Sequence, residues 1–187
     1  LIVLVSTPEV VVGNINNELV AIESAFGSNA SKEIVGETNS AFQTLRPFVD
    51  FTTSFMIDPD DDELGEMSTF SRDFYFATQQ SIETFWNLLY QFILRVNIAI
   101  NVFGLFSIVV LASVIDGWSM RKIKISSFGF TSPVFYKYGF VSLFAIITIF
   151  LILLSLPIEL PIPLYLIVII LISVSARMIS GNMQKKI

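Results

Sequence analysis

The chain has 187 residues, of which 53% are hydrophobic, and its mean hydropathy is +0.72. Soluble domains usually contain roughly 45–50% apolar residues, so the composition predicts a membrane protein. The sequence has neither Cys nor His. Their absence excludes disulfides, thiolate nucleophiles, Cys/His zinc sites and histidine as a general base. We therefore expect no enzymatic activity, no metal site and no cofactor.

The net charge of −5 conceals an uneven distribution of charge along the chain. Residues 1–93 hold 3 basic and 14 acidic residues, whereas residues 94–187 hold 8 basic and 2 acidic residues. Such an asymmetry indicates that the two halves lie in different environments.

The chain begins with the apolar residues 1–5, LIVLV, and without a Met. A transmembrane helix needs about 20 apolar residues. We expect residues 1–5 to be the end of a truncated N-terminal transmembrane helix. A cut signal sequence and an apolar end of a soluble segment are the alternatives.

Two amphipathic helices are predicted next. In the first, Thr7 is the expected N-cap, Pro8 the first helical residue and Gly27 the C-terminal stop. Its apolar face comprises Val11, Ile15, Leu19, Ile22 and Phe26. The second is expected to begin at a Ser31 cap and to be closed by Pro47. Its apolar face comprises Ile34, Val35, Thr38, Phe42 and Leu45, and the two helices are predicted to form a hairpin.

Residues 47–67 are the least regular part of the chain and contain an acidic run from Asp58 to Glu66. Alternating acidic residues at 58, 60 and 62 suit calcium, but an EF-hand loop also needs Gly at its sixth position and Glu at its twelfth. That spacing is missing here, so a solvated acidic loop is expected.

From about Ser68 a helical pattern continues without interruption to Asp116, which predicts one long helix. Its segment 93–115 is the expected transmembrane helix, because 20 apolar residues from Val96 span about 30 Å. Arg95 is expected to snorkel at the outer edge of this span. Helical spacing places Asn97, Asn101 and Gly104 on one stripe, for which we predict helix–helix packing. A polar path through the membrane is the alternative.

The residues Asp116 and Gly117 are expected to end this helix and to begin a basic loop at 116–139. A transmembrane helical hairpin should follow at 140–176, with prolines in its turn, and then a basic tail at 177–187. The fold class is therefore all-α: a polytopic membrane protein with three complete transmembrane helices, a truncated N-terminal one and an extracytoplasmic helical domain at 6–92.

The orientation follows from the positive-inside rule. The basic loop and the basic tail lie on the same side of the predicted spans, which makes the C-terminus cytoplasmic and region 6–92 extracytoplasmic. Arg121, Lys122 and Lys124 alternate with apolar residues and form a strip suited to a partner protein or to a bilayer with anionic headgroups. A loop that only sets topology is the plainer interpretation. The basic loop contains one further cation, Lys137, and four cations are too few for direct nucleic-acid binding.

The stretch with Asp116-Gly117, Arg121-Lys122, Gly129, Ser132 and Tyr136, followed by a two-span hairpin, resembles a family of multi-pass inner-membrane proteins. That family, a domain of unknown function, is encoded in integrating conjugative elements and conjugative plasmids, and the resemblance covers residues 94–187. It implies a bacterial inner-membrane scaffold of a conjugative type IV secretion system, in contact with other membrane proteins of a larger complex and with the coupling ATPase.

Two other functions fit the residues. The first is an accessory structural subunit of an unrelated membrane complex, for example a respiratory one, whose aromatic side chains fill an interface. The second is a small transporter, which needs a polar path along Asn97 and Asn101.

Overall fold

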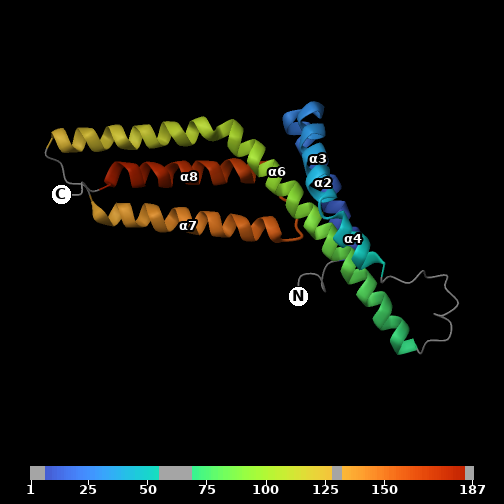
Figure 1. Ribbon diagram of the computed structural model, residues 1–187. Helices are drawn as coiled ribbons and strands as arrows, with labels where there is room; N and C mark the ends of the chain where they lie inside the picture. The colour runs from blue at the N-terminus through green and yellow to red at the C-terminus, as the bar shows by residue number, and fades with distance from the viewer. Residues whose placement is uncertain (1–6, 55–68, 128–131, 184–187) are drawn as a thin grey trace. The chain divides into compact units, whose positions relative to one another are not determined.

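The computed structural model describes residues 7–54, 69–127 and 132–183. These residues form helices and no strand, in the order α2, α3, α4, α6, α7 and α8 (Figure 1). Three of the helices are long and apolar enough to cross a membrane. The all-α, three-span architecture is thus confirmed. The predictions of an N-terminal transmembrane helix end and of a solvated acidic loop fall mostly on residues outside the described ranges.

The chain divides into two compact units. The first unit comprises residues 1–97 together with 155–160, and the second comprises 98–154 together with 161–187. The long helix α6, Thr69–Ser126, contributes residues to both units. Each unit is described separately below.

The first helix of the first unit, α2, spans Pro8–Phe26 as predicted. Thr7 occupies the N-cap, and Gly27 ends the helix with a φ of 85° while donating its N–H to the carbonyl of Glu23. A positive φ is open to Gly at little cost, which explains the stop. Val11, Ile15 and Ile22 are buried as expected, and Glu18 is buried with them.

The predicted limits of the second helix are wrong at both ends. The helix α3 spans Ser28–Gln43, so it begins directly after Gly27 rather than at Ser31. It ends before Pro47, which lies in the first turn of a further short helix, α4, at Arg46–Thr53. Proline is tolerated in a first turn, because the N–H that it lacks has no helical partner there. The helices α2 and α3 contact each other, as the predicted hairpin requires.

The predicted long helix is confirmed, but its predicted end at Asp116-Gly117 is wrong, because α6 continues to Ser126. Gly117 serves close packing instead of chain reversal. A Cβ at this position would lie 2.0 Å from Ser180 Oγ and 2.6 Å from the carbonyl oxygen of Arg177. The missing side chain therefore lets α6 approach α8 closely.

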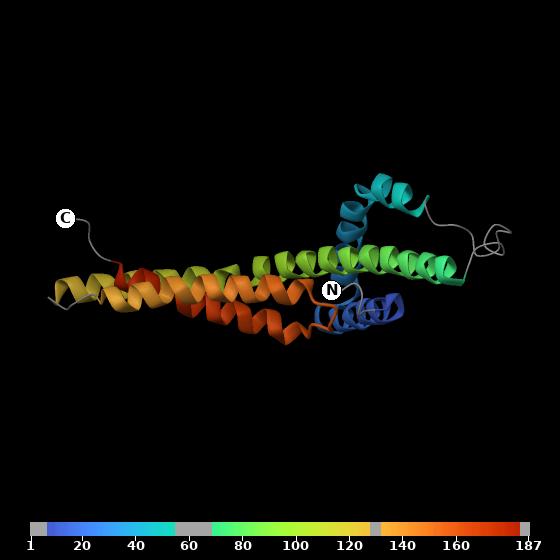
Figure 2. The ribbon, with the colours of Figure 1, turned by 90° about the horizontal axis from the view of Figure 1, so that it is seen from below.

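The second unit consists of the later part of α6, the helix α7 at Pro133–Ser155 and the helix α8 at Ile162–Asn182. The two later helices lie side by side (Figures 1 and 2). Phe150 meets Tyr165 at a centroid distance of 5.7 Å, and Ser142 Oγ lies 3.0 Å from Ser175 Oγ, so they are antiparallel. This confirms the predicted hairpin, although its helices extend beyond the predicted limits of 140 and 176.

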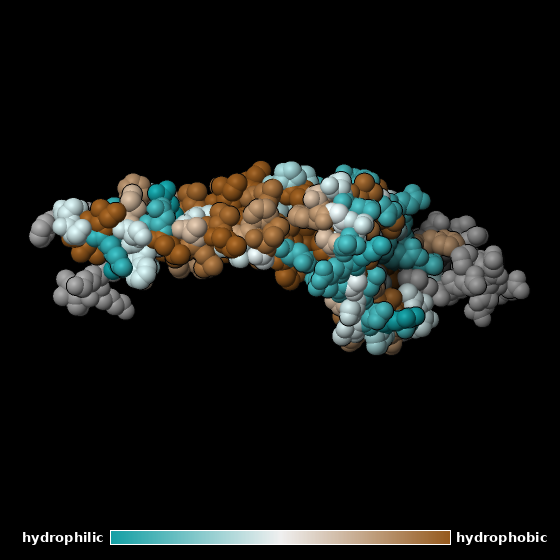
Figure 3. Space-filling view, turned by 90° about the horizontal axis from the view of Figure 1, so that it is seen from above, coloured by the Kyte–Doolittle hydropathy of each residue, from teal (hydrophilic) through white to brown (hydrophobic). Residues whose placement is uncertain are grey.

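Large apolar side chains are exposed along the helices of the second unit, among them Leu105, Phe144 and Ile170. Figure 3 shows hydrophobic residues over much of this unit. Exposed apolar faces are what a lipid environment requires, because lipid tails are as apolar as these side chains.

Candidate functional site

The most tightly connected polar group in the described residues is an ion pair inside the first unit. Glu18 of α2 is 4% exposed, and Arg95 of α6 is fully buried. Arg95 Nη2 lies 2.5 Å from Glu18 Oε1, and Arg95 Nε lies 3.1 and 3.2 Å from the two carboxylate oxygens. The guanidinium thus engages the carboxylate through two of its nitrogens, which is the strongest geometry available to this pair.

Two further groups donate to the same carboxylate. Gln91, one turn before Arg95 on α6, places Nε2 3.3 Å from Glu18 Oε1. The main-chain N–H of Leu160, in the segment between α7 and α8, donates to the same oxygen at 3.3 Å. We call Glu18, Gln91, Arg95 and the main chain of residues 156–160 the Glu18–Arg95 cluster.

The segment 156–160 is held mainly through its carbonyls. Arg95 Nη1 donates to the carbonyl of Leu156 at 2.5 Å, and Arg95 Nη2 donates to that of Ile158. Asn14 Nδ2 donates to the carbonyl of Pro157 at 3.0 Å. Carbonyls at and beyond the end of a helix have no partner in the helix itself, so outside donors must satisfy them. The side chains of α2 and α6 supply these donors.

The cluster is suited to fastening elements together. Burial of two charges costs several kcal/mol per ion, and this cost is repaid only with good geometry and additional hydrogen bonds. Both conditions hold here, since each charge faces the other and each has further partners. The arrangement therefore joins α2, α6 and segment 156–160 within the first unit.

An aromatic group joins α3 and α4 to α6. Phe42 packs edge-on against Trp86 at 6.3 Å and against Tyr90 at 5.4 Å between ring centroids. The indole N–H of Trp86 donates to Thr52 Oγ1 at 2.8 Å, and the hydroxyl of Tyr90 donates to Asn39 Oδ1 at 2.9 Å. Partly buried aromatic rings combine apolar packing with one polar anchor in this way.

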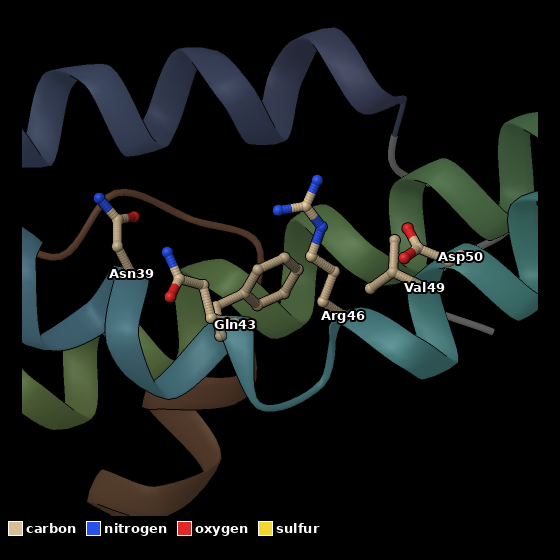
Figure 4. A pocket seen from close by; sticks show the side chains of 6 residues that line it. Asn39, Gln43, Arg46, Val49 and Asp50 are labelled. Carbon is tan, nitrogen blue, oxygen red and sulfur yellow. The ribbon is translucent and has the colours of Figure 1, made fainter.

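A partly open pocket of about 330 Å³ lies beside this aromatic group. It is lined by Asn39, Phe42, Gln43, Arg46, Val49 and Asp50. Figure 4 shows its labelled side chains, which come from consecutive turns of α3 and α4. Amide, guanidinium and carboxylate groups are mixed in the lining, so the pocket favours neither an anion nor a cation.

Of the three residues predicted for helix–helix packing, Asn97 has a contact with another helix in the described structure. Asn97 Nδ2 donates to Thr38 Oγ1 of α3 at 3.0 Å, and Thr38 is fully buried. Asn101 is exposed, and a Cβ at Gly104 would meet nothing within 4 Å. The structure thus brings Asn97 to another helix, whereas packing at Asn101 and Gly104 stays a prediction.

The predicted contact residues Arg121, Lys122 and Lys124 lie on the last turns of α6 rather than in a loop. Arg121 Nε is buried and has no hydrogen-bond partner in the described structure. Lys122 Nζ lies 4.3 Å from the centre of the Trp118 ring, and Lys124 Nζ donates to Asn182 Oδ1 at 3.2 Å.

The Glu18–Arg95 cluster was not predicted from the sequence, and the expectation that Arg95 snorkels is wrong, because this residue is fully buried. A signal was present. Glu18 lies three residues after Ile15 and four before Ile22, which puts it inside the apolar stripe of α2. A charge in such a stripe needs a partner, and Arg95 carries a charge at the edge of an equally apolar segment.

The comparison with known proteins gives the family. A family model described as "IncC plasmid conjugative DNA transfer protein DtrJ-like" matches residues 22–184. No match was found among curated proteins or among solved structures. The match confirms the resemblance to a conjugative-plasmid family and extends it from 94–187 into the helices of the first unit. The chain therefore belongs to the DtrJ-like family of conjugative DNA transfer proteins.

Proposed function

We propose that this protein acts in conjugation as a non-enzymatic scaffold in the bacterial inner membrane, where it holds other membrane proteins of a type IV secretion system and docks its coupling ATPase. Membership of a conjugative DNA transfer family supports the process. Three helices suited to crossing a membrane support the location.

The Glu18–Arg95 cluster is the observation that carries the scaffold role. It joins α2, α6 and segment 156–160 through a network in which both charges are satisfied. Gln91 Oε1 is buried without a hydrogen-bond partner in the described structure, but Glu18 and Arg95 are each paired and further hydrogen-bonded. Paired and hydrogen-bonded buried charges favour a single arrangement of the unit. A scaffold needs this property, because its docking surfaces must stay in fixed positions.

The same contacts support the proposed orientation. Segment 156–160 connects two candidate spans, and it is bonded to α2 through Asn14 and through Asn17, which donates to Glu159. The polar helix α2 and this connection therefore belong on one side of the membrane. Arg121, Lys122 and Lys124 of α6 follow its apolar segment and belong on the other side. The positive-inside rule makes the cationic side cytoplasmic, where a coupling ATPase would be met.

Cross-linking and co-purification from mating donor cells test the proposal. The chain, tagged and produced from the conjugative plasmid at its natural level, should recover inner-membrane secretion subunits together with the coupling ATPase. Glu18→Gln should reduce this recovery and the transfer frequency in parallel, because it unpairs Arg95. Glu23→Gln, an exposed change on the same helix, is the matched control and should leave both unchanged.

The outcomes are distinct. Recovery of quinone- or haem-binding proteins in place of secretion subunits would overturn the proposal in favour of a respiratory accessory subunit. Recovery of secretion subunits without the ATPase would overturn the docking role alone.

A further inference from the structure

The end of α6 combines exposed apolar side chains with cations. Trp118 is 54% exposed and Ile125 is 53% exposed. With 100° between successive residues of a helix, these two side chains lie between Arg121 on one flank and Lys122 on the other. The resulting strip, which we call the Trp118 strip, consists of Arg121, Trp118, Ile125 and Lys122.

One of the two cations retains an unused donor. Arg121 Nε is buried and has no hydrogen-bond partner in the described part of the chain. A buried donor without an acceptor destabilises a folded chain, so a native structure normally supplies an acceptor. A turn of the Arg121 side chain that exposes Nε to an acceptor outside the chain removes this destabilisation.

The other cation is held in place beside the aromatic ring. Lys122 Nζ lies 4.3 Å from the centre of the Trp118 ring. Trp118 precedes Lys122 by one helical turn and lies nearer to the apolar segment of α6. The ring face attracts the ammonium group while its N–H donors remain available. Trp is a residue that prefers the headgroup level of a bilayer.

The depth of the strip suits a lipid phosphate. Arg121 follows Ile115, the last residue of the apolar segment, by six positions, or about 9 Å at 1.5 Å per residue. Helical side chains lean toward the N-terminus, which here points toward the apolar segment, so the cations reach back toward the membrane. The polar layer of a bilayer leaflet is roughly 5–7 Å deep.

The neighbouring charged side chains are bonded to α8. Asp116 Oδ2 lies 2.6 Å from Arg177 Nε of α8, and Lys124 donates to Asn182. Lys124 therefore fastens α6 to α8, and it differs in this respect from Arg121 and Lys122.

We propose that the Trp118 strip binds the phosphate of an anionic phospholipid, with Arg121 and Lys122 as the phosphate-binding residues and Trp118 against the headgroup boundary. The inference goes beyond the proposed scaffold role and does not depend on it. A DtrJ-like protein that docks no secretion subunit would still bind this lipid.

Quenching of Trp118 fluorescence tests the inference. The full chain with Trp86→Phe, which leaves Trp118 as the single tryptophan, is placed in vesicles of phosphatidylcholine and phosphatidylglycerol at a fixed ratio. Either lipid is supplied in brominated form. Brominated phosphatidylglycerol should quench more strongly than its mole fraction predicts, and brominated phosphatidylcholine should quench less strongly.

Single substitutions distinguish a specific phosphate-binding site from a general attraction between cations and anionic lipids. Arg121→Gln and Lys122→Gln should each lower the preference for phosphatidylglycerol about fivefold, the effect of one cation near an anionic surface. Lys124→Gln also removes one positive charge, but this lysine is hydrogen-bonded to Asn182 of α8. This variant should therefore leave the preference for phosphatidylglycerol nearly unchanged. Lys122 is exposed, so its replacement does not disturb packing. Quenching in proportion to mole fraction, or an equal loss in all three variants, would overturn the proposal.

Discussion

Glu18 and Arg95 stand 77 residues apart in sequence, yet Arg95 Nη2 lies 2.5 Å from Glu18 Oε1 in the interior of the first unit. Around this pair, side chains of α2 and α6 also donate hydrogen bonds to main-chain carbonyls of the connection between α7 and α8. A polar helix and the connection between two candidate spans thus share one network. In this protein of the DtrJ-like family, the ion pair links α2, α6 and the connection between α7 and α8.

Loss of the Glu18 charge should destabilise the protein strongly. Glu18→Gln leaves a buried guanidinium without its counter-charge, a change that costs about 3–5 kcal/mol. For a chain of this size, each kcal/mol corresponds to roughly 2–4 °C, so the apparent melting temperature in detergent should fall by roughly 10 °C. Glu23→Gln on the exposed side of α2 should change it little. An equal fall in both variants would contradict the assigned role of the pair.

Replacement of both partners should be far milder than replacement of one. Glu18→Met combined with Arg95→Met removes both buried charges, and apolar replacements of buried ion pairs are often neutral or stabilising. Segment 156–160 then loses its carbonyl partners, so we expect partial rather than full recovery of the melting temperature. A double variant less stable than Glu18→Gln would show that the hydrogen bonds from Arg95 to residues 156–160 outweigh the ion pair.

The two glycines of α6 should respond to substitution in opposite directions. A Cβ at Gly117 would clash with Ser180 Oγ and with the carbonyl of Arg177, so Gly117→Ala should separate α6 from α8 and lower the melting temperature. Gly104→Ala meets nothing within 4 Å and should stabilise the helix by about 1 kcal/mol, the propensity difference between the two residues. Both variants are measured by thermal unfolding in one detergent. A loss of stability at Gly104 would mean that this residue packs against another molecule.

The helical periods and the apolar segments predicted the fold correctly because they act locally. The start of α2 at Pro8, its end at Gly27 and the long run of α6 all follow from neighbouring residues. The limits of α3 were predicted wrongly for a local reason, because Pro47 is tolerated in the first turn of α4. The end of α6 was predicted wrongly because a distant contact decided the outcome. Gly117 has the appearance of a helix end, yet contact with α8 keeps it helical.

The candidate site was harder to predict for the same reason. Helical spacing predicts that Asn97 packs against another helix, but its partner is Thr38, which no local pattern identifies. Glu18 and Arg95 each interrupt an apolar pattern, and each interruption can be recognised from the sequence without knowledge of the other. Which charge pairs with which depends on the path of the chain through α3 and α4, and periodicity carries no information about that path.

The hydroxyl of Tyr90 should contribute to the attachment of α3. It donates to Asn39 Oδ1 at 2.9 Å, and a hydrogen bond of this kind is worth about 1 kcal/mol net. Tyr90→Phe keeps the ring that packs against Phe42, so only the polar contact is lost. Amide hydrogen exchange in α3 should accelerate about fivefold, the factor that corresponds to 1 kcal/mol. Tyr138→Phe, at an exposed residue of α7, should leave this exchange unchanged.

The proposed orientation of the chain gives a further prediction. Because the cations of α6 and α8 lie at the same end of the second unit, a C-terminal fluorescent protein that folds only in the cytoplasm should be bright. Alkaline phosphatase, which is active only outside the cytoplasm, should be inactive at the C-terminus. The same enzyme inserted between α2 and α3 should be active, because α2 is bonded to the connection at the opposite ends of α7 and α8. An active C-terminal phosphatase would reverse the orientation of every span and would place the Trp118 strip on the outer face of the membrane.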